Sequence, residues 1–218
     1  MMSKTVLAKP VLICLYGFPG SGKSYVARSL ATALPLAHVS ADRIRSELFR
    51  QPRYDAQENA VVLHLMNYMT EEFLNAGISV AYDVNAARSG QRRALRELAK
   101  RHHAEFLLVW LQIDEESAFA RTQNRDRRTT DDHYAQDHTQ ETFDAQTANM
   151  QPPQAEDYLV ISGKHAFITQ KNAIINRLHQ RKLISDDVVR QNIAKPDLIN
   201  LIPNPFTAPN DQRNIEVR

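Results

Sequence analysis

The chain has 218 residues, a formal net charge of +2 at pH 7, and 43% hydrophobic and 24% charged residues. This composition is ordinary for a globular protein and argues against global disorder. It also excludes an overall polyelectrolyte surface, so a nucleic-acid partner would have to use a local basic patch.

The apolar segments are short. The first ten residues, MMSKTVLAKP, hold no apolar stretch of signal-peptide length, and no run of 18 apolar residues occurs in the chain. The single cysteine, Cys14, lies in an apolar run and cannot form an internal disulfide. We therefore expect a cytoplasmic protein without a membrane partner.

The first half of the chain alternates apolar runs with helical patterns. Residues 11–16, VLICLY, do not alternate with polar residues, which predicts a strand buried on both faces. A helix over 23–34, a short strand over 37–40 and a long amphipathic helix over 55–76 follow. The expected apolar stripe of the long helix consists of Val62, Leu65, Met66, Met69 and Phe73.

The second half continues the alternation. Strands are predicted at 78–83, 104–113 and 157–162, and helices at 89–103, 114–124 and 166–181. Strands that are separated by helices indicate βαβ units, hence an α/β fold with a mostly parallel sheet covered on both sides.

The C-terminal part differs from the rest. We predict one domain over residues 1–181 and, over 182–218, a short helix followed by a proline-rich arm, because four prolines after residue 195 exclude regular structure. The arm also carries apolar side chains such as Leu201 and Phe206. It could lie on its own domain, contact an oligomer or partner, or be disordered.

A glycine-rich stretch follows the first strand. Residues 17–24, GFPGSGKS, match G-x-x-x-x-G-K-[ST] between a predicted strand and a predicted helix. Glycines let backbone N–H groups converge on a polyphosphate, the lysine reaches the β- and γ-phosphates, and the serine ligates Mg²⁺. We predict a site for ATP and Mg²⁺ here, formed by Gly17, Phe18, Pro19, Gly20, Ser21, Gly22, Lys23, Ser24 and Tyr25.

Polar residues also follow the second and third strands, at the edge of the sheet where the phosphate loop lies. Asp42 could accept the proton of an attacking hydroxyl and Arg45 could hold an anionic group, although Asp42 could equally cap a helix. Asp83 could hold a Mg²⁺-bound water or a substrate hydroxyl beside Asn85, or it could simply form a turn.

A charged segment follows the fourth strand. Arg121, Arg125 and Arg128 recur at helical spacing and suit a lid over about 121–140 that closes on the transferring phosphates. A solvated helix face is the alternative. His133 and His138 lie among aspartates, but without a rigid ligand spacing we expect a solvated lid and no metal site.

The ordered set of motifs resembles the P-loop kinases of the polynucleotide-kinase and zeta-toxin type, an AAA-like ATP-binding group, over roughly residues 10–180. The resemblance implies a P-loop NTPase fold with three αβα layers and a five-stranded parallel sheet of order 2-3-1-4-5. It also implies that Asp42 is the general base, Arg45 grips the acceptor, and Arg121 and Arg125 are lid arginines. Asp83 and Asn85 would help to place the substrate.

We therefore expect a kinase that transfers the γ-phosphoryl group of ATP to a hydroxyl. A 5′-hydroxyl of a nucleic acid or nucleotide is the first acceptor hypothesis, because Arg45 suits an acceptor phosphate and Arg92, Arg93 and Arg96 would extend a basic track. The small net charge favours instead a metabolite, nucleotide-sugar or antibiotic hydroxyl.

A nucleotide-dependent switch that contacts a partner through the C-terminal arm is the alternative from another class. A GTPase would need a guanine-specifying N-K-x-D motif, and the sequence contains none.

Overall fold

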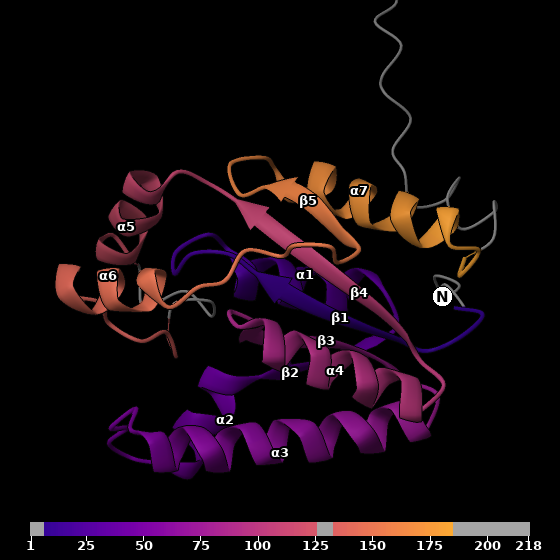
Figure 1. Cartoon of the computed structure of the whole chain (residues 1–218), viewed down its shortest axis with the longest axis horizontal. Helices are drawn as coiled ribbons and strands as arrows, with labels where there is room; N and C mark the ends of the chain where they lie inside the picture. Colours follow the sequence, from indigo (N-terminus) through magenta and orange to yellow (C-terminus); the bar gives the residue numbers. More distant parts are fainter. Residues whose placement is uncertain (1–6, 126–132, 185–218) are drawn as a thin grey trace, which may run out of the picture.

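The computed structural model describes residues 7–125 and 133–184, and its core is an all-parallel sheet (Figure 1). The strands are β1 (Val11–Tyr16), β2 (Leu36–Ser40), β3 (Ser79–Asn85), β4 (Glu105–Gln112) and β5 (Tyr158–Ser162). Their order is β2-β3-β1-β4-β5. This confirms the predicted P-loop NTPase fold with strand order 2-3-1-4-5.

Helices cover both faces of the sheet (Figure 1). They are α1 (Lys23–Ala33), α2 (Ala41–Leu48), α3 (Ala56–Asn75), α4 (Ser89–Arg101), α5 (Glu115–Gln123), α6 (Gln140–Ala148) and α7 (Phe167–Gln180). The apolar residues of α1 and α7 form one core with the sheet, and those of α3 and α4 form a second core on the opposite face. All six residues of β1 are buried, as predicted for a central strand.

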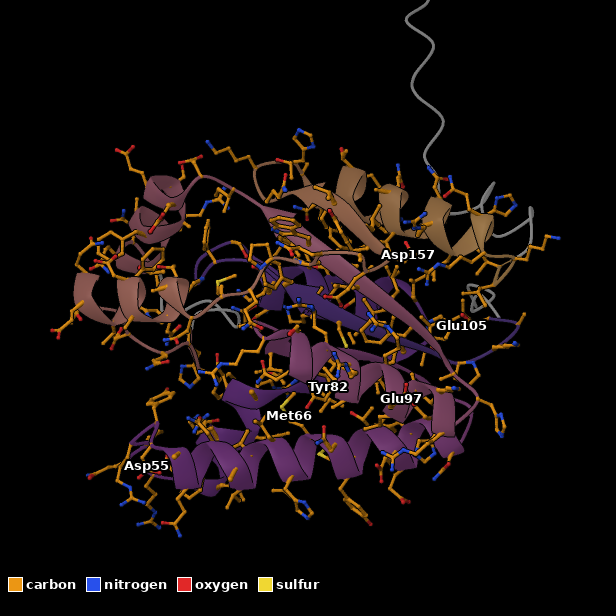
Figure 2. All side chains as sticks on the ribbon, viewed as in Figure 1. Asp55, Met66, Tyr82, Glu97, Glu105 and Asp157 are labelled. Atoms are coloured by element: carbon orange, nitrogen blue, oxygen red, sulfur yellow. The ribbon has the colours of Figure 1, made fainter. Side chains whose placement is uncertain are left out.

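The helix α3 is stabilised at its start and packs through a narrower stripe than predicted. The Asp55 carboxylate accepts a hydrogen bond from the Glu58 backbone N–H and caps the helix (Figure 2). The apolar residues buried on its inner face are Val62, Met66 and Leu74. The predicted Leu65, Met69 and Phe73 are half-buried at the margin of this stripe.

The sequence analysis did not predict α6. Its sequence, QETFDAQTA, has no apolar stripe, and only Phe143 is buried. Thr139 caps the helix by accepting a hydrogen bond from the Thr142 backbone N–H. Phe143 packs edge-on against Phe119 of α5, so tertiary packing of one aromatic residue holds a helix that the sequence pattern does not indicate.

Two predicted segments lie wholly or partly outside the described residues. The predicted arm falls there from residue 185 onward, and so does the middle of the predicted lid, including Arg128. Within residues 7–125 and 133–184, every helix is too short or too polar to cross a lipid bilayer.

The predicted basic track on α4 is wrong, because two of its three arginines belong to an internal ion cluster. Arg92 is fully buried, with its Nη2 2.7 Å from Oε1 of Glu156 and its Nη1 donating to the Ala86 carbonyl. Arg96 reaches the other Glu156 oxygen at 2.9 Å. These arginines tie α4 to the connection between α6 and β5, and Arg92 is closed to an outside partner, whereas the Arg96 side chain stays 40% exposed.

We predict that Glu156→Gln lowers the free energy of unfolding by roughly 2 kcal/mol or more, because Arg92 would keep its buried charge without a carboxylate partner. Chemical denaturation measures the change. Glu97→Gln, on the exposed face of α4 (Figure 2), is the matched control and should stay within about 0.5 kcal/mol of the wild type. Equal effects of the two substitutions would contradict the role of the ion cluster.

Candidate active site

The loop between β1 and α1 has the backbone conformation that its glycines permit. Gly20 and Gly22 have φ values of +79° and +96°, in the region that side chains disfavour. A Cβ on Gly20 would lie 2.2 Å from the Ala118 carbonyl oxygen of α5. The loop is therefore packed directly against the helix that follows β4, which leaves no room for a side chain at this position.

Lys23 reaches back across the loop. Its Nζ donates to the carbonyl oxygens of Gly17 and Phe18, at 2.9 and 2.8 Å. Burial lowers the pKa of Lys23 to about 8, against the opposing effect of the Asp83 carboxylate. The ammonium thus stands at the centre of the loop, where a polyphosphate would meet it.

Ser24 and Asp83 connect the loop to β3. The Ser24 hydroxyl donates to Oδ1 of Asp83 at 3.1 Å, and the other oxygen, Oδ2, lies 2.9 Å from Nε2 of His38 on β2. Asp83 is 5% exposed and lies within β3, which excludes the interpretation of Asp83 as a turn residue. A hydroxyl and a buried carboxylate side by side are oxygen donors of the kind that Mg²⁺ prefers.

Asp42 lies in the first turn of α2. The N-cap position is Ser40, so the interpretation of Asp42 as the helix cap is wrong. Burial and the nearby Asp83 carboxylate raise the pKa of Asp42 to about 6, against the opposing effect of Arg45, Arg125 and Lys23. A carboxylate with this pKa is ionised at neutral pH and is still basic enough to accept a proton.

These residues share one cavity of about 610 Å³. The predicted site residues that line it are Pro19, Gly20, Ser21, Gly22, Lys23, Ser24, Tyr25, Asp42, Asp83, Asn85 and Arg121. Gly17 and Phe18 lie outside the lining and contribute carbonyl groups to Lys23 instead. The Gly17 backbone N–H points to the Asn85 side-chain oxygen at 3.4 Å, which links the loop to the end of β3.

Arg45 does not line the cavity. It is 6% exposed, and its guanidinium binds Glu58 at 3.3 Å and Asn59 at 2.6 Å, both in α3. It also lies over the Tyr54 ring, 4.6 Å from the centroid. The structure thus places Arg45 in a contact between α2 and α3, and gripping an acceptor would require it to leave these partners.

The two predicted lid arginines occupy different positions. Arg121 Nη1 donates to the Gly163 carbonyl at 2.9 Å, in the turn after β5. A Cβ on Gly163 would lie 2.8 Å from the Ser21 carbonyl oxygen, so this turn is pressed against the phosphate loop. Arg125 donates to the Gln136 carbonyl, across the segment 126–132 that lies outside the described residues.

The sequence analysis missed several residues of the site. The turn residues Gly163, Lys164 and His165 line the cavity, and so does His138, which is 8% exposed and not in a solvated lid as predicted. Burial lowers the pKa of His138 to about 4, with a further contribution from Arg125. The stretch SGKH after the fifth predicted strand was the only available signal, because a strand end in this sheet faces the cavity.

The side chains fit a Mg²⁺ ion that is held jointly with phosphates. No cluster of three or more His, Cys, Asp or Glu side chains that could hold a metal alone occurs among residues 7–125 and 133–184. Ser24 and Asp83 would supply two oxygens, and nucleotide phosphates and water would supply the others, which is the usual arrangement for Mg²⁺ at nucleotide sites.

Residues 12–153 match a protein family described as an AAA domain. This match spans the phosphate loop, Asp42, Asp83 and the two arginines predicted to lie in a lid, Arg121 and Arg125. No curated protein matches the sequence.

Solved structures share the fold at low sequence identity. A putative kinase from Chloroflexus aurantiacus aligns with a TM-score of 0.62 at 15% identity, covering 80% of this chain and 98% of its own. Kti12 from Chaetomium thermophilum, in complex with ADP-AlF3, aligns with a TM-score of 0.58 at 16% identity, covering 80% of this chain and 99% of its own. A sugar kinase from Janibacter aligns with a TM-score of 0.56 at 16% identity, covering 83% of this chain and 98% of its own. At these identities the likeness establishes the fold alone.

We predict that Gly20→Ala lowers the melting temperature and weakens ATP binding more than Gly22→Ala does. Both substitutions incur the cost of a left-handed backbone, about 1–2 kcal/mol, but only the first also drives a Cβ into the Ala118 carbonyl. The Cβ of the second would meet nothing within 4 Å. Thermal unfolding and calorimetric titration with ATP measure both effects, and equal losses would contradict the packing argument.

Proposed function

The chain belongs to the AAA-domain family, and from this premise we propose that it is an ATP-dependent kinase of the polynucleotide-kinase and zeta-toxin type, which transfers a phosphoryl group to a hydroxyl. The observation that carries the proposal is the convergence of Lys23, Ser24, Asp42 and Asp83 on one cavity of about 610 Å³. A switch protein needs the phosphate loop, but it has no use for a second carboxylate at the cavity, half-buried and with a pKa raised toward neutrality.

The phosphate loop would hold the triphosphate. Backbone N–H groups of the loop and the ammonium of Lys23 bind the β- and γ-phosphates, and Lys23 exchanges its carbonyl partners for phosphate oxygens. Ser24 and Asp83 hold the Mg²⁺ ion, which neutralises developing charge on the phosphates when it is bound. Tyr25 and the turn at 163–165 also line the cavity, and the nucleoside would lie against them.

Asp42 would act as general base. Its ionised carboxylate accepts the proton of the acceptor hydroxyl, whose oxygen bonds to the γ-phosphorus while the bond from that phosphorus to the bridging oxygen breaks and ADP leaves. Arg121 and Arg125 would stabilise the transferring charge from the lid side, and Asn85 would hydrogen-bond the acceptor. Positioning and charge neutralisation thus supply most of the rate.

A small hydroxyl-bearing molecule fits the acceptor side better than a nucleic-acid end. The hypothesis of a 5′-hydroxyl acceptor needed Arg45 and the α4 arginines as phosphate ligands. Arg45 is paired with Glu58, and Arg92 and Arg96 are paired with Glu156. A neutral acceptor requires none of these side chains to give up its partner.

Transfer of label from γ-labelled ATP tests the proposal. With Mg²⁺ and a metabolite extract, we expect label in a small organic product, and Asp42→Asn should reduce this transfer about 10²–10⁴-fold while ATP still binds. Asp144→Asn, exposed on α6, is the control and should leave transfer unchanged. Label on a 5′-hydroxyl oligonucleotide would identify a nucleic acid as the acceptor. Equal release of free phosphate by wild type and Asp42→Asn would contradict the proposal that the protein is a kinase.

The pH dependence of kcat/KM should be bell-shaped. The rising limb follows ionisation of Asp42, with a pKa of about 6, and the falling limb follows loss of the Lys23 proton, with a pKa of about 8. Residual activity of Asp42→Asn should lack the rising limb. A profile that is flat between pH 5 and 7 in the wild type would contradict the assignment of the base.

Asp42→Asn should also stabilise the fold at neutral pH. Because the folded state raises the pKa of Asp42 from 3.8 to about 6, its ionised form costs stability, fully above pH 6 and progressively less toward pH 4. Removing the charge should raise the free energy of unfolding by roughly 1–3 kcal/mol at pH 7 and have little effect at pH 4. Thermal unfolding at both pH values measures the difference, and a gain of equal size at both would contradict this cause.

A further inference from the structure

We propose that His38 is a positioning residue for the metal-binding carboxylate, whose imidazole holds Asp83 in place for Mg²⁺. This inference rests on the proposed function, because it assigns the Mg²⁺·ATP site to Ser24 and Asp83. His38 belongs to none of the sequence motifs, and it does not itself line the cavity; it contacts the lining residue Asp83 from behind.

The parallel pairing of β2 and β3 brings the two side chains together. Ser40 is the register partner of Asp83, and His38 lies two residues earlier on β2, so it projects from the same face of the sheet as Ser40. The imidazole Nε2 lies 2.9 Å from Oδ2 of Asp83, and the two side chains are 9% and 4% exposed. The contact is thus buried and is fixed by two strands of the central sheet.

The surroundings of the ring indicate which nitrogen carries the proton. Nε2 must donate, because a carboxylate oxygen can only accept. Nδ1 is buried and has no hydrogen-bond partner within the described part of the chain. The ring is therefore anchored through Nε2 alone, and its contact with Asp83 is the one hydrogen bond that orients it within the described part of the chain.

The Asp83 carboxylate is held at both of its oxygens. Oδ2 is oriented by His38, while Oδ1 receives the Ser24 hydroxyl at 3.1 Å. The orientation of the carboxylate plane is therefore set by one contact on each oxygen. Such partners behind a metal-binding group commonly contribute 10–100-fold to metal affinity.

Three substitutions separate positioning from packing. His38→Gln can place an amide N–H near the position of Nε2, His38→Asn is an amide of the same chemistry whose shorter side chain does not reach Asp83, and His38→Leu removes the donor. His64→Leu, exposed on α3, is the matched control. The probe is a fluorescent ATP analogue, titrated with Mg²⁺ and, separately, in the presence of EDTA.

We expect His38→Leu and His38→Asn to raise the Mg²⁺ concentration for half-maximal tightening of analogue binding about 10–100-fold, with metal-free binding unchanged. His38→Gln should recover most of the loss, and His64→Leu should match the wild type. If His38→Leu fails to fold, the comparison of Gln with Asn decides the question.

Three results would overturn the inference. Wild-type and Asn variants with the same Mg²⁺ dependence would show that Asp83 needs no support from His38 and would leave the kinase proposal standing. Loss of metal-free binding in parallel with Mg²⁺-dependent binding would indicate a merely structural role. A wild type whose analogue binding does not respond to Mg²⁺ would instead overturn the proposed metal site itself, and this inference with it.

Discussion

The candidate site depends on holding two carboxylates and one ammonium together with little access to water. Burial and the Asp83 carboxylate raise the pKa of Asp42, while Arg45, Arg125 and Lys23 lower it, so the nearby cations offset part of the cost of holding the two carboxylates together. Burial strengthens these interactions, since water would screen them at a surface. Such an arrangement lowers the free energy of unfolding, and the packing of the sheet and its ion clusters must offset this loss.

The sheet meets this requirement by fixing the charged groups at the carboxyl ends of neighbouring strands. Asp83 belongs to β3, Asp42 follows β2, and Lys23 follows the central strand β1 through the glycine-rich loop. The turn after β5 supports the loop from the other side, because Gly163 contacts Ser21 and accepts a hydrogen bond from Arg121. Strands far apart in the sequence thus define a single rigid wall of the cavity.

The features that the sequence predicted correctly are those with local causes. The loop pattern, the buried central strand and the alternation of strands with helices each depend on neighbouring residues, and they led to the right strand order once the resemblance was added. The roles of the arginines were harder to predict, because Arg45 pairs with Glu58, 13 residues away in the sequence, and Arg92 pairs with Glu156, 64 residues away. His38 and α6 also depend on tertiary partners, Asp83 and Phe119, which no local pattern reveals.

The central position of β1 has a consequence for how the protein is made. Its neighbours in the sheet are β3 and β4. Both edges of the apolar segment VLICLY can therefore be paired only after the chain has been synthesised through β4, which ends at residue 112. Until then the nascent chain carries an exposed strand of the kind that associates with other chains. The cavity lining runs from the first loop to the turn after β5, so a nucleotide bound there would selectively stabilise chains whose sheet is complete.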